Sequence, residues 1–246
     1  MIDIHSHILP QVDDGSDSDI TSFNLLVEAV NEGISDVCVT PHFSRIDDYL
    51  VYKDELEKRF NHLKKKCANL NINLYLGNEL MIYEKLDQLL IDGKVCTLNN
   101  SNYVLIEFPM DEYKYIYDEY LMNVSLSGYR IIIAHPERYK YVQNDIDFVY
   151  RWINNGYYIQ INQYSLFNLK TKRTANRLLD KQLVNLVASD AHSINRPLVL
   201  KDAYVSIVKR YSKETADLLF KTNPYNVLTN KDIVKIPNNK KRIHIL

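Results

Sequence analysis

Short apolar runs rich in β-branched residues alternate with longer stretches of helical period along these 246 residues, and this alternation limits the fold more than any other feature. The runs lie near residues 2–4, 37–40, 72–76, 104–108, 131–134, 158–161 and 186–188. Such a pattern is typical of βα units built on a parallel sheet. A chain of this length forms either two small domains or one α/β barrel. We expect one domain, because no repeat or linker rich in proline and glycine divides the chain.

The first two stretches of helical period have clear signals. The first begins after Ser18, a favourable cap residue, and ends before Gly33. Its apolar residues are predicted to form one face: Ile20, Phe23, Val27 and Val30. The second covers about residues 54–70 and is predicted to pack one stripe against a sheet, formed by Leu56, Phe60, Leu63, Cys67 and Leu70.

Composition and charge exclude several classes of protein. Thirty basic and thirty-one acidic residues give a formal charge of -1, which provides no general attraction to nucleic acid or anionic lipid. Cys38, Cys67 and Cys96 contain no Cys-x-x-Cys pair, so neither a disulfide framework nor a thiolate zinc site is predicted. No apolar run reaches the roughly 18 residues of a membrane span, and no signal peptide is recognisable. We therefore expect a cytoplasmic protein without direct membrane insertion.

Residue types that bind metals follow six of the seven apolar runs. His5 and His7 follow the first, and alternate residues of an extended strand point to the same side, so both imidazoles can reach one ion. The later runs are followed by His42, Glu79, Glu107, His135, and Asp190 with His192. If the parallel strands close into a barrel, their ends meet at its C-terminal rim, where barrel enzymes carry their chemistry. We therefore expect these side chains to converge.

Taken singly, each of these residues has an ordinary explanation, such as a solvated carboxylate or a turn histidine. Taken together, five histidines and several acids at one buried rim would be costly unless metal ions neutralised the acids. The donors are nitrogen and oxygen without thiolate, which suits Mn²⁺, Zn²⁺ or Fe²⁺. They exceed the needs of one ion, so a cluster of two or three ions is predicted, with a carboxylate such as Glu79 as a bridge.

Two arginines stand close to these residues in the sequence. Arg138 follows three residues after His135, and Arg196 four after His192. Guanidinium groups match phosphate oxygens, so the pair predicts a phosphoester substrate, with surface ion pairs as the ordinary alternative. The chain has no Gly-x-x-x-x-Gly-Lys, Gly-x-Gly-x-x-Gly or Cys-x5-Arg element, which argues against these routes to nucleotide binding and thiolate catalysis. A nucleophile generated by metal is therefore expected.

In several segments the chain resembles the polymerase and histidinol phosphatase (PHP) superfamily, and within it the bacterial protein-tyrosine phosphatases of the CpsB/CapC type. The segments are Asp3-Ile4-His5-Ser6-His7 with Asp13-Asp14-Gly15, Thr40-Pro41-His42, Gly77-Asn78-Glu79, Ile106-Glu107-Phe108-Pro109, His135-Pro136-Glu137-Arg138-Tyr139 and Ser189-Asp190-Ala191-His192. The resemblance implies one α/β domain over residues 1–246, a distorted TIM-like (β/α)7 barrel that holds three divalent ions. Manganese is the implied metal, with iron and zinc as alternatives.

The resemblance also implies a ligand set. It assigns one ion to His5, His7, Glu79 and Asp190, a second to Glu79, Glu107 and His135, and a third to Asp14, His42 and His192. Either Asp13 or Asp14 can be the acid of the third ion, and the family pattern of an acid directly before glycine points to Asp14.

The implied activity is hydrolysis of phosphotyrosine by a metal-bridging hydroxide, with Arg138 and Arg196 as catalytic residues that bind the phosphoryl group. The implied partner is a phosphotyrosine protein, namely a membrane-associated bacterial tyrosine kinase that regulates capsule or exopolysaccharide synthesis. Two alternatives are a small-molecule phosphatase, such as a histidinol phosphatase, and a non-catalytic metal-binding scaffold. A tyrosine-rich segment after Pro109 departs from the family pattern, and helical spacing predicts that its tyrosines pack in the core, namely Tyr113, Tyr117 and Tyr120.

Overall fold

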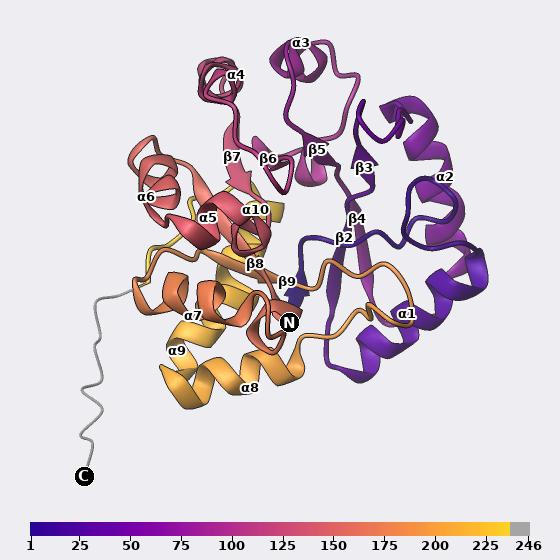
Figure 1. The fold of residues 1–246 in the computed structure, drawn as a ribbon. Helices are drawn as coiled ribbons and strands as arrows, with labels where there is room; N and C mark the ends of the chain where they lie inside the picture. The colour runs from indigo at the N-terminus through magenta and orange to yellow at the C-terminus, as the bar shows by residue number, and fades with distance from the viewer. Residues whose placement is uncertain (237–246) are drawn as a thin grey trace.

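The strands form a curved parallel sheet with helices around its outside (Figure 1), in a computed structural model that describes residues 1–236. One part of the sheet contains β1 (Ile2–Asp3), β2 (Asp36–Val39) and β4 (Asn73–Leu76). The other part contains β3 (His42–Phe43), β5 (Glu79–Met81), β6 (Tyr103–Glu107), β7 (Arg130–Ile133), β8 (Tyr158–Asn162) and β9 (Leu186–Ala188). All pairings between these strands are parallel.

Two breaks divide the sheet, and the short strands β3 and β5 continue β2 and β4 beyond them. Pro41 lies in the first break, where its missing N–H cannot donate to a ladder. Gly77 lies in the second, where an added Cβ would be 2.7 Å from Leu98 Cδ2. Asn78 joins the breaks, because its Nδ2 donates to the Pro41 carbonyl at 2.9 Å and its Oδ1 accepts from the Cys96 amide at 2.8 Å. Sequence periodicity did not predict β3 and β5, which are too short to show a period.

The barrel closes between the first and last strands. Ser6 and Ala191 form an isolated parallel bridge, and the His7 amide donates to the Ala191 carbonyl at 2.7 Å. On its other side, Ser6 accepts from the Thr40 amide at 2.8 Å. With β2–β3 and β4–β5 each taken as one broken strand, seven strands surround the axis. The predicted (β/α)7 barrel is confirmed, and the two breaks are its distortion.

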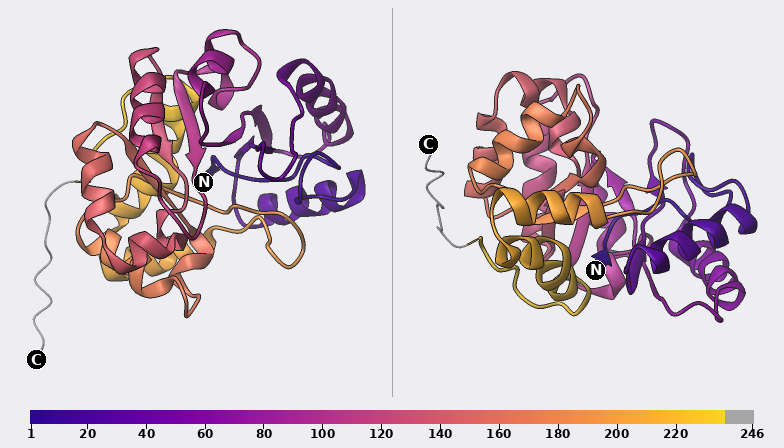
Figure 2. Two further views of the ribbon diagram at one scale, coloured as in Figure 1. Left: turned by 45° about the horizontal axis from the view of Figure 1, so that its top comes forward. Right: turned by 90° about the horizontal axis from the view of Figure 1, so that it is seen from below.

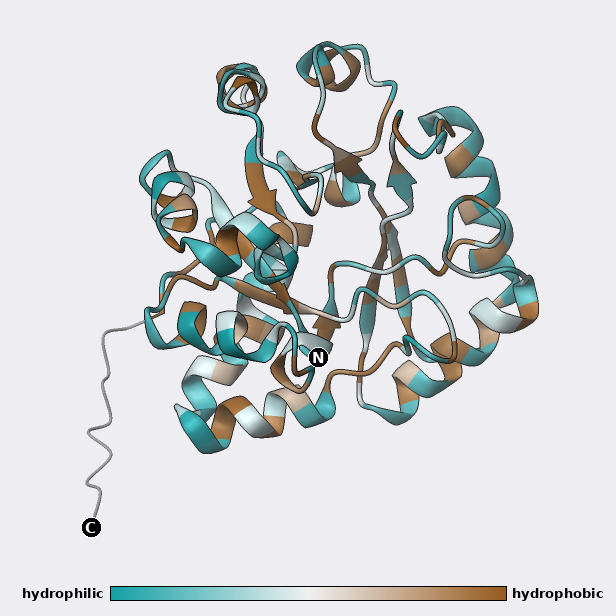
Figure 3. Cartoon of the chain, in the orientation of Figure 1, coloured by the Kyte–Doolittle hydropathy of each residue, from teal (hydrophilic) through white to brown (hydrophobic). Residues whose placement is uncertain are grey.

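Helices cover the outside of this barrel, and Figure 2 shows them from two further directions. They are α1 (Asp19–Asn31), α2 (Lys53–Lys66), α3 (Leu86–Ile91), α4 (Ile116–Leu126), α5 (Lys140–Asn144), α6 (Asp147–Asn154), α7 (Lys172–Asp180), α8 (Lys201–Arg210), α9 (Lys213–Asp217) and α10 (Asn223–Leu228). Short helical turns lie at η1 (Leu98–Asn100), η2 (Pro136–Arg138), η3 (Gln163–Leu166) and η4 (Leu218–Thr222). Figure 3 shows hydrophobic and hydrophilic residues interspersed along the helices. Within residues 1–236, every helix is too short or too polar to cross a bilayer.

The structure confirms the predicted cap of helix α1 but shows a different buried face from the predicted one. The Ser18 hydroxyl accepts from the Thr21 amide at 3.2 Å, as expected for an N-cap. Ile20, however, is 74% exposed, so the predicted apolar face does not point inward. The buried face is instead the one that packs Leu25, Leu26 and Ala29 into the core, and the Ser22 hydroxyl on this face donates to the Ile8 carbonyl at 2.7 Å. The residues buried on α1 are Ser22, Leu25, Leu26 and Ala29.

Helix α2 ends earlier than predicted but buries the predicted stripe. Leu56, Phe60 and Leu63 are buried within it, and Cys67 is the buried cap residue that follows. The three tyrosines predicted to be core residues behave as predicted: Tyr117 is buried, and Tyr113 and Tyr120 pack against the core.

An aromatic cluster supports the ends of β6 and β7, from which predicted metal ligands project. Trp152, on α6, is fully buried and stacks on Phe108 with ring centroids 5.4 Å apart and an interplanar angle of 8°. The Phe108 amide donates to the Tyr139 hydroxyl at 3.1 Å, which itself donates to the Ala134 carbonyl at 2.7 Å. One tyrosine thereby ties the end of β6 to the end of β7.

We predict that Trp152→Ala lowers the free energy of unfolding by about 3–5 kcal/mol, because it leaves a cavity against Phe108. Urea denaturation followed by circular dichroism measures the change. Leu126→Ala is the control, since this side chain is 78% exposed and its loss should change stability by less than about 0.5 kcal/mol. Equal effects of the two substitutions would contradict the assignment of Trp152 to the core.

Candidate metal centre

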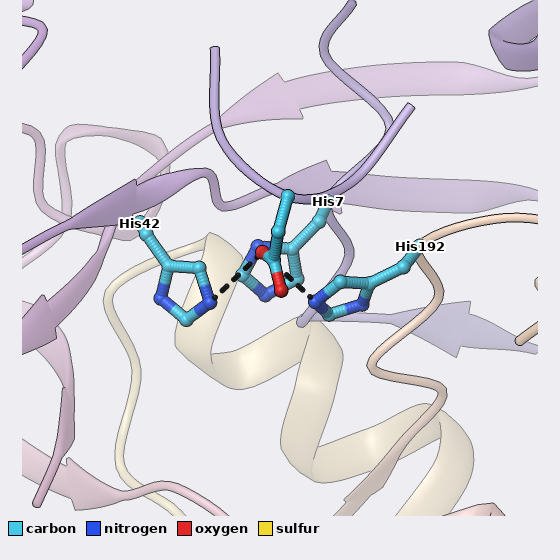
Figure 4. Close-up of side chains that lie close together, drawn as sticks. His7, His42 and His192 are labelled. Atoms are coloured by element: carbon cyan, nitrogen blue, oxygen red, sulfur yellow. Dashed lines mark ion pairs between the residues drawn. The ribbon is translucent and has the colours of Figure 1, made fainter. Parts of the chain in front are cut away.

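The side chains predicted to bind metal converge at the C-terminal end of the barrel. Their donor atoms form three groups, each within 4.8 Å: His5, His7, Glu79 and Asp190; His42, Glu79 and Glu107; and His7, Asp14, His42 and His192. His135 lies beside the second group, with Nε2 at 2.8 Å from Glu79 Oε1 and 3.9 Å from Glu107 Oε2. Figure 4 shows His7, His42 and His192 directed toward one another. The structure therefore brings together all nine predicted residues.

His5 and His7 face each other through their Nε2 atoms, which are 3.1 Å apart. His5 Nδ1 is 2.9 Å from Gln160 Oε1, and His7 Nδ1 is 2.8 Å from Asp13 Oδ2. Both of these oxygens can only accept hydrogen bonds, so both Nδ1 atoms carry the proton. In the neutral imidazoles the two Nε2 lone pairs then point at each other. This arrangement is repulsive unless a proton or a metal cation lies between them.

Strand β8 orients two of these ligands, although its sequence indicated no ligand. Gln160 Nε2 donates to Asn162 Oδ1 at 2.9 Å, and Asn162 Nδ2 donates to Asp190 Oδ2 at 2.6 Å. Hydrogen bonds thus run from His5 through Gln160 and Asn162 to Asp190. The sequence analysis missed these two residues. Their signal was two polar side chains two positions apart in an apolar strand, which places both inside the barrel.

Asp13 and Asp14 have different surroundings. Asp13 Oδ2 accepts from His7 Nδ1 and from the His42 amide, each at 2.8 Å. Asp14 Oδ1 lies 3.5 Å from Nε2 of both His42 and His192. Asp13 is therefore occupied in orienting other ligands, whereas Asp14 faces ring nitrogens. Of the two candidates that the sequence left open, the geometry favours Asp14 as the ligand.

Glu79 lies at the centre of the cluster. Its Oε2 is 3.1 Å from Nε2 of His5 and of His7 and 3.2 Å from His42 Nδ1, while its Oε1 is 2.8 Å from His135 Nε2. Burial by itself would raise the pKa of this carboxyl. The neighbouring imidazoles outweigh burial and hold the pKa of Glu79 well below its usual range. Glu79 is therefore ionised and placed to bridge two cations.

The acids of the cluster attract positive charge. Burial lowers the pKa of His5, but the neighbouring carboxylates, Glu79 above all, outweigh burial and raise it to about 9. Burial and the charge of Glu79 raise the pKa of Glu107. His135 differs, because burial and the charge of Arg138 lower its pKa to about 4, so its imidazole is neutral and able to bind a metal at neutral pH.

The backbone is strained at two of these ligands. His135 follows β7 with φ of 33°, and Asp190 follows β9 with φ of 56°. A non-glycine residue in the left-handed region costs of the order of 1–3 kcal/mol and persists only where its surroundings hold it. The Asp190 amide donates to the His5 carbonyl at 2.9 Å, which fixes this turn against the first strand.

Asp190 connects the metal ligands to the two arginines. Its Oδ2 accepts from Arg138 Nη1 at 3.0 Å and from Arg196 Nη2 at 2.7 Å. Its Oδ1 lies 3.5 Å from Nε2 of both His5 and His7. Both arginines line a pocket of about 320 Å³ together with several of the metal ligands. Each guanidinium has five N–H groups and uses one on Asp190, so others are available to an anion in this pocket.

The residues present fit divalent metal ions. Glu79 Oε2 is buried beside three ring nitrogens, and no hydrogen bond of good geometry within residues 1–236 reaches it. An unsatisfied buried carboxylate oxygen costs at least about 1–3 kcal/mol, and coordination to a cation removes this cost. The donors are imidazole and carboxylate, the ligands that first-row divalent ions prefer.

Comparison with known proteins identifies relatives over nearly the whole chain. A family model described as "Capsular polysaccharide synthesis, CpsB/CapC" matches residues 1–229. Tyrosine-protein phosphatase YwqE of Bacillus subtilis is 32% identical over 246 residues, which cover 96% of this chain and 95% of the relative. Tyrosine-protein phosphatase CpsB of Streptococcus agalactiae is 36% identical over 250 residues, which cover 94% of this chain and 99% of the relative.

Solved structures agree with these relatives. A crystal structure from work on YwqE of Bacillus subtilis and CpsB of Streptococcus pneumoniae, described there as metal-dependent tyrosine phosphatases, matches with a TM-score of 0.91 and 30% identity. The match covers 96% of this chain and 98% of the other. A histidinol phosphate phosphatase of Lactococcus lactis matches with a TM-score of 0.54 and 16% identity, over 89% of this chain and 96% of the other. This second likeness is one of fold alone.

We predict that Gln160→Met destabilises the chelator-treated protein by about 1–3 kcal/mol, because the buried His5 Nδ1–H and Asn162 Oδ1 both lose their partner. Urea denaturation measures the effect. Gln88→Met is the matched control, since Gln88 is an exposed helical residue that contacts only Asp92 through its side-chain amide, and we expect a change below about 0.5 kcal/mol. If Gln160→Met leaves the free energy of unfolding unchanged, the hydrogen bonds through β8 do not stabilise the cluster.

Proposed function

Because the chain belongs to the CpsB/CapC family of capsular polysaccharide synthesis, we propose that it is a metal-dependent protein-tyrosine phosphatase. One observation carries the proposal: a single pocket is lined by imidazole and carboxylate donors and by two arginines joined to them through Asp190. The family model matches residues 1–229, a range that includes every residue of the pocket.

We assign three divalent ions to the cluster. The first takes His5, His7, Glu79 and Asp190, the second takes Glu79, Glu107 and His135, and the third takes Asp14, His42 and His192. The first and third sets each lie within one of the three donor groups. His42 Nδ1 also lies 2.9 Å from Glu107 Oε1, so this imidazole stands between the second and third positions. Nitrogen and oxygen donors support manganese, with iron and zinc as alternatives.

The arginines bind and orient the phosphoryl group. When bound, the metal ions supply a water of lowered pKa as the nucleophile and offset the charge of the phosphoryl oxygens. Arg138 and Arg196 donate to the non-bridging oxygens, and Asp190 holds both guanidinium groups at the edge of the cluster. Charge that accumulates on these oxygens in the transition state strengthens the same hydrogen bonds.

The pocket also suits an aryl leaving group. Ile46, Tyr49 and Met110 also line it and can pack against a phenyl ring. A tyrosinate, whose conjugate acid has a pKa of about 10, needs less protonation to leave than a serine alkoxide does. We infer that the physiological substrate is a phosphotyrosine protein. The family name supports a membrane-associated bacterial tyrosine kinase of capsule or exopolysaccharide synthesis as that protein.

We predict that Arg138→Ala lowers kcat on p-nitrophenyl phosphate by about 100-fold while the metal content stays the same, because the guanidinium acts on the phosphoryl group and not on the ions. Steady-state kinetics and inductively coupled plasma mass spectrometry measure the two quantities. Arg177→Ala is the control and should keep full activity, because Arg177 is an exposed residue of α7 that does not line the pocket. Full activity of Arg138→Ala would remove this arginine from the mechanism.

We predict that chelation abolishes hydrolysis of p-nitrophenyl phosphate and that added Mn²⁺ restores it, with about three ions bound per chain. Asp14→Asn should lose one equivalent of metal, because Asp14 faces the third position. Asp17→Asn is the control, since this exposed acid bonds only to Ser18 and Thr21, and it should keep all the metal. Activity that survives complete removal of metal would exclude the proposed chemistry.

A further inference from the structure

A second pocket adjoins the metal pocket. Its volume is about 300 Å³, and it shares Arg138, Asp190 and Arg196 with the metal pocket. Its remaining wall comes mainly from η3 and the segment that leads into α7, residues 163–171, together with the end of β8 and the loop after β9. A group bound here would therefore lie next to the phosphoryl group held by the same two arginines.

The wall of this second pocket is positively charged. Arg138, Arg196 and Lys170 line it, and Asp190 is its single acid within residues 1–236. Asp190 Oδ2 already accepts hydrogen bonds from both arginines, so it does not neutralise Lys170. Lys170 is exposed and forms no ion pair with the described part of the chain. The pocket therefore includes a lysine whose charge has no partner among residues 1–236.

The rim of the second pocket includes Tyr164, and the segment that carries this residue exposes further apolar side chains. Tyr164 lines the pocket and is 59% exposed, and Leu169, beside Lys170, is 94% exposed. Phe167 is a third exposed apolar side chain in this segment. Large apolar side chains gathered at the edge of a charged pocket are typical of a surface that binds a polypeptide, whereas a free anion would need only the charges.

We infer that the second pocket is a subsite for an Asp or Glu side chain of the substrate polypeptide, next to the phosphotyrosine in the metal pocket. This inference rests on the proposed function and names the substrate class more closely. Lys170 attracts the carboxylate, Asn168 and Asn195 lie in the same wall as hydrogen-bond donors, and the exposed apolar side chains of the same segment pack against the chain on either side. The protein then prefers phosphotyrosines with acidic neighbours over those with neutral neighbours.

The test compares two phosphotyrosine peptides on the metal-loaded full-length protein, one with Asp and Glu beside the phosphotyrosine and one with Asn and Gln at the same positions. The wild type should prefer the acidic peptide. Lys170→Ala should reduce the ratio of the two kcat/KM values about two- to fivefold, mainly through KM, as expected for one exposed charge. Lys170→Arg should keep the preference, and added salt should weaken it.

Lys65→Ala is the matched control, because Lys65 is an exposed lysine on α2, an element that contributes nothing to the wall of either pocket. It should keep the wild-type ratio. A folded Lys170→Ala with an unchanged ratio, or a wild type with equal kcat/KM for both peptides, overturns the subsite while leaving the phosphatase assignment intact. Failure of the wild type to hydrolyse either peptide or p-nitrophenyl phosphate in Mn²⁺ overturns the proposed function, and the subsite with it.

Discussion

The facing lone pairs of His5 and His7 are the constraint on which the rest of this structure depends. Two neutral imidazoles whose protonated nitrogens are held by Gln160 and Asp13 direct their Nε2 lone pairs at each other across 3.1 Å, an arrangement that requires a proton or a metal cation between them. The backbone holds them there. β1 pairs with β2, and the segment after β1 that carries both histidines bonds to Ala191 after β9. A barrel that forces donors together in this way is preorganised for cations before any cation binds.

Asp190 extends this constraint to the substrate side of the site. One of its oxygens faces His5 and His7, and the other accepts hydrogen bonds from Arg138 and Arg196. A single buried carboxylate thereby fixes the distance between the metal positions and the groups that bind phosphate. The same two arginines stand between the metal pocket and the second pocket, so recognition of the reacting group and of its neighbour in the polypeptide would share one wall.

The two breaks in the sheet serve the same site. Without the breaks, β2 would continue straight through residues 40–41 and β4 through residues 77–78. Pro41 and Gly77 interrupt the strands, and the short strands β3 and β5 resume in a new sheet where His42 and Glu79 are register partners. The distortion of the barrel is therefore what places an imidazole and the central carboxylate side by side. Asn78 compensates for the ladder bonds lost at the breaks.

The sequence by itself determined the seven strand-like segments and most of the metal-binding residue types at their ends, because strand periodicity is local, whereas the (β/α)7 barrel and Asp14 were implied by the family resemblance. It could not determine the buried face of α1, which depends on how Leu25, Leu26 and Ala29 pack against the rest of the core. Nor could it separate Asp13 from Asp14 or reveal Gln160 and Asn162, since hydrogen bonds between distant strands decide these roles. Only the tertiary structure decided them, because the direction of a donor or acceptor is set by contacts that no sequence period encodes.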